Sequence, residues 1–135
     1  MKRDIFIISF LLVLFIAALN ELAVNYFFYW RIWWFDILMH FLGGLWVGLS
    51  ALWLYVFSDY FKNPRRDAEF IFVLSVSSVA VVGIGWEVFE FLIESNYSSG
   101  YIEDTILDLI MDLIGALVAG TIVFKTNKKR IQNIL

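Results

Sequence analysis

The chain has 135 residues, of which 61% are hydrophobic, and its mean hydropathy is +0.80. This composition is typical of an integral membrane protein, and the length suits a single domain over residues 1–135. The formal net charge is only -3, and the absence of cysteine excludes disulfides, thiolate metal sites and cysteine nucleophiles. Because the basic residues are few and lie near the ends or in one loop, we expect no nucleic-acid partner.

Four hydrophobic segments follow one another along the chain, at about residues 5–29, 37–57, 70–92 and 106–124. Each is long enough to cross ~30 Å of hydrocarbon at ~1.5 Å per residue. They predict an all-α, polytopic integral membrane protein, a bundle of four transmembrane helices. The basic start of the first segment also resembles a secretory signal. However, the apolar run continues past Asn20 without a clear A-x-A cleavage site, which favours a retained span.

Basic residues are placed asymmetrically around these segments. Those before the first, between the second and third, and after the fourth are Lys2, Arg3, Lys62, Arg65, Arg66, Lys125, Lys128, Lys129 and Arg130. Only Arg31 falls on the other side. The positive-inside rule therefore predicts cytoplasmic N- and C-termini in a multi-pass protein of the plasma or inner membrane. Aromatic residues at 26–34 suit the outer headgroup level, Asn63-Pro64 marks an inner turn, and residues 95–100 mark an outer turn.

The fourth segment carries an acidic stripe. Asp104, Asp108 and Asp112 recur at four-residue spacing, so a helix presents all three on one face. Gly115 and Ala119 continue that face and are small, which favours close packing against other helices. The stripe is therefore predicted to point inward. An ionisable residue inside a membrane span is costly, and it is a functional-site hypothesis by default.

The second and third segments carry matching polar faces. Asp36 and His40 are four residues apart, and Glu87 and Glu90 are three residues apart, so each pair shares a helix face. The predicted topology brings both pairs to the outer half of the membrane. Glu21 joins them, as part of the site or as a polar contact between helices. We predict a bundle that is close-packed toward the cytoplasm and opens into an acidic pocket toward the outside.

Negative charge is concentrated in that outer half. Nine of the 13 acidic residues lie at or near it: Glu21, Asp36, Glu87, Glu90, Glu94, Glu103, Asp104, Asp108 and Asp112. Since Arg31 is the only fixed cation predicted there, either the carboxylates are protonated or they share a bound cation. Carboxylates suit Mg²⁺, Mn²⁺ or Ca²⁺, and a histidine leaves Zn²⁺ or Fe²⁺ open.

We therefore predict a divalent-cation site, with candidate catalytic groups at Glu87 and His40. The predicted metal ligands are Asp36, His40, Glu87, Glu90, Asp108 and Asp112.

Simpler interpretations exist for some of these residues. Asp36 and Asp104 lie near predicted helix starts and could cap them. His40 could be an interfacial histidine that is hydrogen-bonded to a neighbour. Capping does not explain Asp108 and Asp112, which lie one and two turns deeper, so they carry the strongest functional prediction.

The spacing of these motifs resembles two families. The motifs are Asp36-x-x-x-His40-x-x-Gly43, Trp86-Glu87-x-x-Glu90 and Asp104-Thr105-x-x-Asp108-x-x-x-Asp112-x-x-Gly115. They resemble the YjdF-like family of small inner-membrane proteins and, more distantly, the VanZ-like family. The VanZ-like pattern usually has Asn at 112, Gln at 90 and an Arg before the final helix. The resemblance implies a shared functional pocket, and VanZ-like proteins, associated with glycopeptide resistance, point to the cell envelope.

Three classes of function follow from this pattern. The first is a metal-dependent membrane enzyme or binder that acts on a lipid-linked or phosphate-bearing headgroup, where cations neutralise developing charge. The second is a proton or cation carrier, or a metal sensor, since such proteins use protonatable groups within spans. The third is a scaffold subunit whose pocket holds a partner's Lys or Arg. Membrane lipid is the expected partner, and Gly44-x-x-x-Gly48 could support a homo-oligomer.

Overall fold

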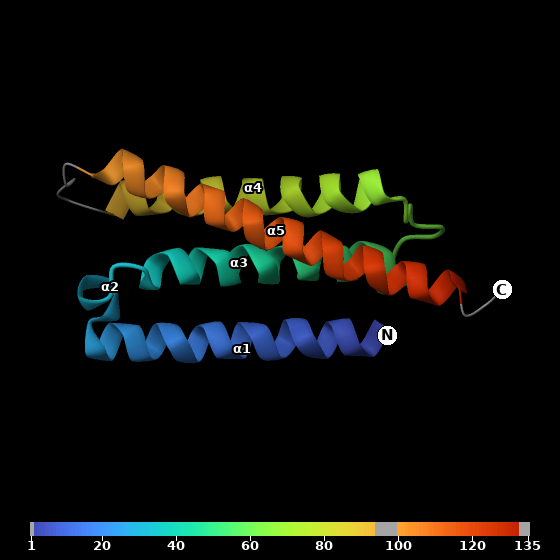
Figure 1. Cartoon of the computed structure of the whole chain (residues 1–135), viewed down its shortest axis with the longest axis horizontal. Helices are drawn as coiled ribbons and strands as arrows, with labels where there is room; N and C mark the ends of the chain where they lie inside the picture. Colours follow the sequence, from blue (N-terminus) through green and yellow to red (C-terminus); the bar gives the residue numbers. More distant parts are fainter. Residues whose placement is uncertain (1, 94–99, 133–135) are drawn as a thin grey trace.

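The computed structural model describes residues 2–93 and 100–132, the last four of these by their backbone alone, and every long element in it is helical (Figure 1). The elements in chain order are α1 (Lys2–Tyr26), α2 (Phe28–Arg31), α3 (Phe35–Leu52), the π-helical turn η1 (Trp53–Phe57), α4 (Ala68–Ile93) and α5 (Tyr101–Gln132). The described ranges contain no strand, which confirms the predicted all-α fold. Glu94 and most of the predicted outer turn lie outside the described residues.

Four helices are long and apolar enough to cross a membrane, as predicted: Lys2–Tyr26, Phe35–Phe57, Ala68–Ile93 and Tyr101–Lys128. The protein is therefore a multi-pass membrane protein. The first span ends at Tyr26 and not at residue 29, because Phe27 adopts a left-handed conformation with φ 59°. The fourth begins at Tyr101, five residues before the predicted start at 106, so its acidic stripe begins within the first helical turn.

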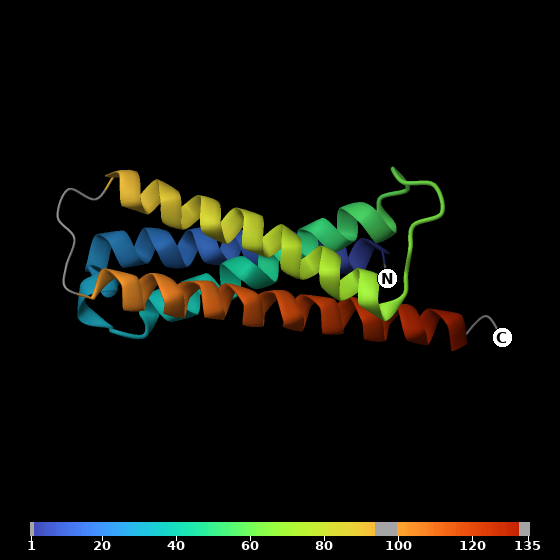
Figure 2. The same ribbon diagram turned by 90° about the horizontal axis from the view of Figure 1, so that it is seen from above.

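Both ends of the described chain lie at the same end of the bundle as the loop between η1 and α4 (Figures 1 and 2). The basic residues that these segments carry are Lys2, Arg3, Lys62, Arg65, Arg66, Lys125 and Lys128. The positive-inside rule predicts that this end faces the cytoplasm and that α2, at the opposite end, lies on the outer side.

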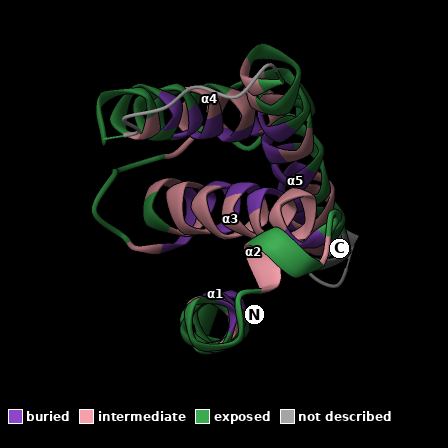
Figure 3. Cartoon of the chain, turned by 90° about the vertical axis from the view of Figure 1, so that its left-hand side faces the viewer, coloured by how far each residue is buried: buried purple, intermediate pink, exposed green. Residues whose placement is uncertain are grey.

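The core is formed by α3, α4 and α5, which pack against one another, whereas α1 lies to one side (Figure 3). Among the described residues, α1 contacts α2, α3 and η1 but neither α4 nor α5. In the cytoplasmic half, apolar side chains are almost fully buried: Leu49, Leu52, Val56, Ile71, Ala119 and Val123. This half of the bundle is therefore close-packed, as the small residues predicted.

Glycines allow α3 and α5 to cross backbone against backbone. A Cβ atom on Gly115 would lie 2.5 Å from main-chain atoms of α3, and one on Gly44 would overlap the main chain of Asp112. Neighbouring Gly43 has no such neighbour within 4 Å. Only residues without a side chain permit this approach, which fixes the rotation of each helix at the crossing.

The start of α4 offers a test of local stability outside the membrane span. Asp67 accepts a hydrogen bond from the Phe70 N–H at 3.0 Å and two from the Arg65 guanidinium at 3.0 Å. The Arg65 guanidinium, and then the Phe70 N–H, hold the pKa of Asp67 below its usual range. Because the folded-state pKa is lowered, this stabilisation is present above about pH 4 and is lost as the pH falls through the folded-state value.

We expect Asp67→Ala to lower the melting temperature of the detergent-solubilised protein at pH 7, because it removes the helix cap. Asp67→Asn keeps an acceptor for the Phe70 N–H, so it should lower the melting temperature less than Asp67→Ala does. Equal melting temperatures for Asp67→Ala and the parent protein would contradict the capping role.

Candidate metal centre

The crossing of α3 and α5 determines which polar side chains meet. His40 lies one helical turn before Gly44 on α3, and Asp112 lies just before Gly115 on α5. Because the glycines bring the two backbones into contact, the next turns toward the outer end face each other across a short gap. His40 on α3 therefore meets Asp108 and Asp112 on α5.

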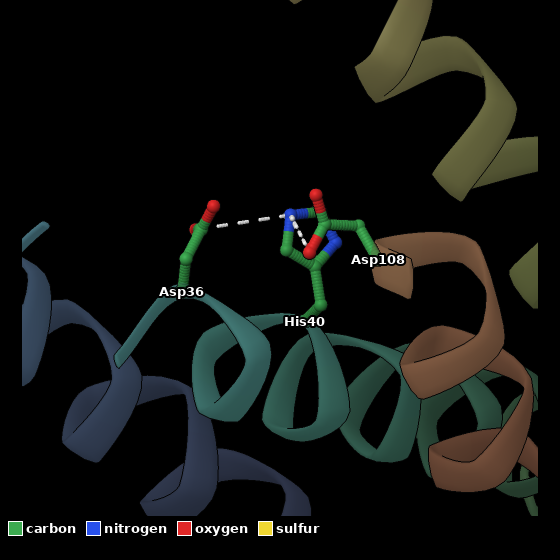
Figure 4. A group of neighbouring side chains, drawn as sticks. All are labelled: Asp36, His40 and Asp108. Atoms are coloured by element: carbon green, nitrogen blue, oxygen red, sulfur yellow. Dashed lines mark ion pairs between the residues drawn. The ribbon is translucent and has the colours of Figure 1, made fainter. Parts of the chain in front are cut away.

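The two ring nitrogens of His40 face different carboxylates. Nε2 lies 3.9 Å from Oδ1 of Asp36 and 3.9 Å from Oδ1 of Asp108 (Figure 4). Nδ1 lies 3.6 Å from Oδ1 of Asp112. The imidazole is thus placed between carboxylates from its own helix and from α5, with each nitrogen directed at an acidic group.

Asp36, His40 and Asp108 form a group with the spacing of a metal site. Each offers one ligand atom, and these atoms all lie within 4.8 Å of one another. Bonds of ~2.1 Å place two ligands of one ion up to about 4.2 Å apart. The 3.9 Å separations already fit, and the whole set needs only a small closing movement to hold a cation.

Burial distinguishes this group from a cluster of surface charges. Asp108 is 3% exposed, and the Asp36 side chain is 39% exposed, so the group opens toward the outer end through Asp36. Among the described residues, Oδ1 of Asp108 and Oε1 of Glu87 are buried without a hydrogen-bond partner. Burying a carboxylate oxygen without a hydrogen-bond partner costs free energy, and a bound cation or a proton would remove that cost.

The structure places the other predicted ligands around this group but not within it. Glu87 on α4 is 7% exposed and lies within electrostatic range of Asp108, while Glu90 is partly buried. Asp112 contacts the opposite nitrogen of His40. Asp104 is exposed in the first turn of α5. The acidic cluster therefore has a buried inner part and an exposed outer part.

The structure bears on Asp36 and Glu21, for which the sequence left a simpler role open. The cap position of α3 is occupied by Trp34, so Asp36 lies inside the first turn and is not the capping residue. Glu21 does not join the cluster, because it is exposed and accepts a hydrogen bond from Asn25 of the same helix at 2.9 Å.

Sequence reasoning missed Tyr29, which lies beside the outer edge of the cluster. Its hydroxyl donates a hydrogen bond to Oδ1 of Asn20 at 2.8 Å, which ties the segment after α1 back to that helix. Burial, and then the charges of Asp36 and Glu90, raise the pKa of the Tyr29 hydroxyl. The only sequence signal was its place in an aromatic run, which predicted an interfacial ring.

Comparison with known proteins identifies one family. A family model described as "Predicted membrane protein (DUF2238)" matches residues 3–129. None of the curated proteins and none of the solved structures matches the chain.

Proposed function

This chain belongs to the DUF2238 family of predicted membrane proteins, and for this membrane protein we propose a divalent-cation site formed by Asp36, His40 and Asp108. The observation that carries the proposal is the buried Oδ1 of Asp108, which has no hydrogen-bond partner among the described residues and lies 3.9 Å from Nε2 of His40. A cation between these groups satisfies both. The YjdF-like resemblance is compatible with this family, and the cell-envelope role drawn from the VanZ-like resemblance stays a prediction.

The donor set favours particular ions. Mg²⁺ and Ca²⁺ prefer oxygen ligands throughout, whereas an imidazole suits Zn²⁺ and other transition metals. A site with one nitrogen and two carboxylates therefore supports Zn²⁺ or Mn²⁺ over Mg²⁺ and Ca²⁺. Asp36 lies in the first turn of α3, where the helix dipole further stabilises its carboxylate.

We extend the proposal to a lipid-linked or phosphate-bearing headgroup of the outer leaflet as the substrate or ligand. A cation held by Asp36, His40 and Asp108 would supply a Lewis acid for a phosphoryl oxygen or a bound water, and Glu87, whose Oε1 has no partner in the described chain, would be the group that accepts a proton. Support comes from the position of the cluster toward the outer end. Trp30 and Trp33 are 79% and 83% exposed at that end, as expected of rings at headgroup level.

A cation carrier has less support than a one-sided site. Below the cluster, the helix interfaces are filled by apolar side chains, including Leu52, Ile71 and Val123, each 0% exposed. The buried hydroxyl of Ser75 is already committed, since it donates to the carbonyl of Ala116 at 2.8 Å. The cytoplasmic half therefore offers a permeating ion few free ligands.

The test is the metal content of protein purified in detergent without chelators, measured by mass spectrometry. We expect a stoichiometric divalent cation in the parent protein and its loss in Asp108→Asn. Asp104→Asn is the matched control, because it makes the same change one turn away on the same helix at an exposed position. Glu87→Gln distinguishes two roles of Glu87. If Glu87 acts only as a base, the substitution should leave the metal content unchanged, whereas if Glu87 is a metal ligand, the substitution should lower it.

A folded parent protein that takes up no metal, even after incubation with Mg²⁺, Mn²⁺, Zn²⁺ and Ca²⁺, would contradict the proposal. The carboxylates would then be protonated or would meet a cationic group of a partner, as in the scaffold alternative.

A further inference from the structure

Asp112 is held by a glycine from each of the other two core helices. Gly44 of α3 leaves room for its main chain, and Gly83 of α4 leaves room for its carboxylate, because a Cβ atom on Gly83 would overlap Oδ2. The next glycine of α4, Gly85, has no neighbour within 4 Å of such a Cβ atom. Oδ2 of Asp112 therefore occupies the space that a side chain at position 83 would fill, with Leu109 at its edge, and we call this space the Gly83 notch.

The other oxygen of Asp112 faces the Nδ1 edge of the imidazole, opposite the nitrogen that meets Asp36 and Asp108. Oδ1 lies 3.6 Å from Nδ1 of His40, in ion-pair range and one small rotation away from hydrogen-bond distance, while Nε2 points at Asp36 and Asp108. A neutral imidazole carries its proton on one nitrogen and offers a lone pair on the other. Ligation through Nε2 requires the proton on Nδ1, and a carboxylate beside Nδ1 favours that tautomer and fixes the ring orientation.

We propose that Asp112 is a positioning residue that holds the Nδ1–H of His40, and that the Gly83 notch fixes Asp112 for this purpose. The inference deepens the proposed cation site, on which its metal-binding consequence rests. Asp112 then orients the histidine and is not itself a metal ligand. Gly83 takes part in the site by leaving room for the Asp112 carboxylate.

Substitutions at the Gly83 notch and at Asp112 can change the position of the Asp112 carboxylate and its charge separately. Gly83→Ala fills the notch and displaces the carboxylate without changing any charge. Asp112→Glu keeps the charge but is one methylene longer than the notch allows. Asp112→Asn keeps the size and removes the charge. If Asp112 acted only through its charge, the first two variants would resemble the parent protein.

The first measurement needs no metal. The chain contains one histidine, so protein labelled with ¹⁵N-histidine gives the ring signals of His40 alone. In the metal-free parent and in the control Gly85→Ala, we expect a downfield Nδ1–H proton that exchanges slowly with water. Gly83→Ala, Asp112→Glu and Asp112→Asn should each lose it. An unchanged signal in the folded Gly83→Ala and Asp112→Glu variants would overturn the proposal.

The second measurement is Zn²⁺ affinity. Loss of an orienting carboxylate lowers metal affinity by about 10–100-fold, and we expect this loss in Gly83→Ala and in Asp112→Asn. Because both changes break one interaction, the double variant should bind no more weakly than the weaker single variant. Additive losses of Zn²⁺ affinity in the double variant would contradict the inference that Gly83 acts by positioning the Asp112 carboxylate. A parent protein that binds no Zn²⁺ but shows the protected Nδ1–H would contradict the cation site alone and leave the positioning role supported.

Discussion

In the presence of a chelator, the Asp108→Asn variant is expected to unfold at a higher temperature than the parent protein. Asp108 is 3% exposed, and its Oδ1 has no hydrogen-bond partner among the described residues. Burial disfavours its charged form, as do the nearby carboxylates of Asp36, Asp104 and Glu87, whereas the nearby His40 favours it. The amide removes both the buried charge and the repulsion. The amide is still a buried polar group without a partner, at a cost of about 1–3 kcal/mol, but a charged group in the same condition costs more, and the variant gains that difference.

A saturating divalent cation should reverse this order. A ligand that binds only the folded state stabilises it by about 2.7 kcal/mol at 100 times its dissociation constant. The parent protein gains this stability from the cation. The Asp108→Asn variant, which lacks one of the coordinating carboxylates, does not. Tryptophan fluorescence melts in detergent, with and without chelator, measure both conditions. The exposed control Asp104→Asn removes only one of these repulsions, so with chelator it should raise the melting temperature less than Asp108→Asn does, and like the parent it should gain stability from the cation. The same order of stability in both conditions would contradict a cation site at Asp108.

Gly44→Ala and Gly115→Ala are expected to destabilise the bundle strongly, whereas Gly43→Ala should leave it nearly unchanged. At Gly44 and Gly115, the new Cβ atom would meet main-chain atoms of the opposite helix, which cannot move aside as a flexible side chain does. Overpacking of this kind costs about 1–3 kcal/mol. Gly43 is the matched control, because it adjoins Gly44 and has open space around it.

Unfolding in mixed micelles with a rising fraction of SDS measures this difference. The two destabilised variants should also lose the cation, since the same crossing brings His40 to Asp108 and Asp112. Equal stability of Gly43→Ala and Gly44→Ala would show that the helices separate without cost at this point.

Much of the fold was predictable because the bilayer imposes strong constraints on sequence. Hydropathy predicted four spans, and four helices of sufficient length are present. Four-residue spacing correctly put Asp108 and Asp112 on one buried face of α5. Hydropathy does not encode backbone conformation, so the end of the first span was wrong. Phe27 breaks the helix there through a left-handed backbone that its residue type gives no reason to expect.

The candidate site was less predictable, since it depends on how helices rotate about their axes. Spacing put Asp104 on the stripe with Asp108, yet Asp104 is exposed in the first turn of α5, whereas Asp108, one turn deeper, is buried. Pattern alone also gave no way to tell which nitrogen of His40 faces which carboxylate. That distinction comes from the glycine contacts at positions 44 and 115, where distances between backbones decide the geometry.

The packing of α5 against both α3 and α4 has a consequence for biosynthesis. Asp36 and His40 are made early, and Glu87 follows on α4, but Asp108 and Asp112 are made only with the last of the described helices. Until that helix enters the membrane, the histidine has neither carboxylate of α5 beside it. The buried charges of α5 thus arrive when the helices that surround them are already in place. A ribosome that stalls before α5 would release a chain with three apolar spans and no complete site.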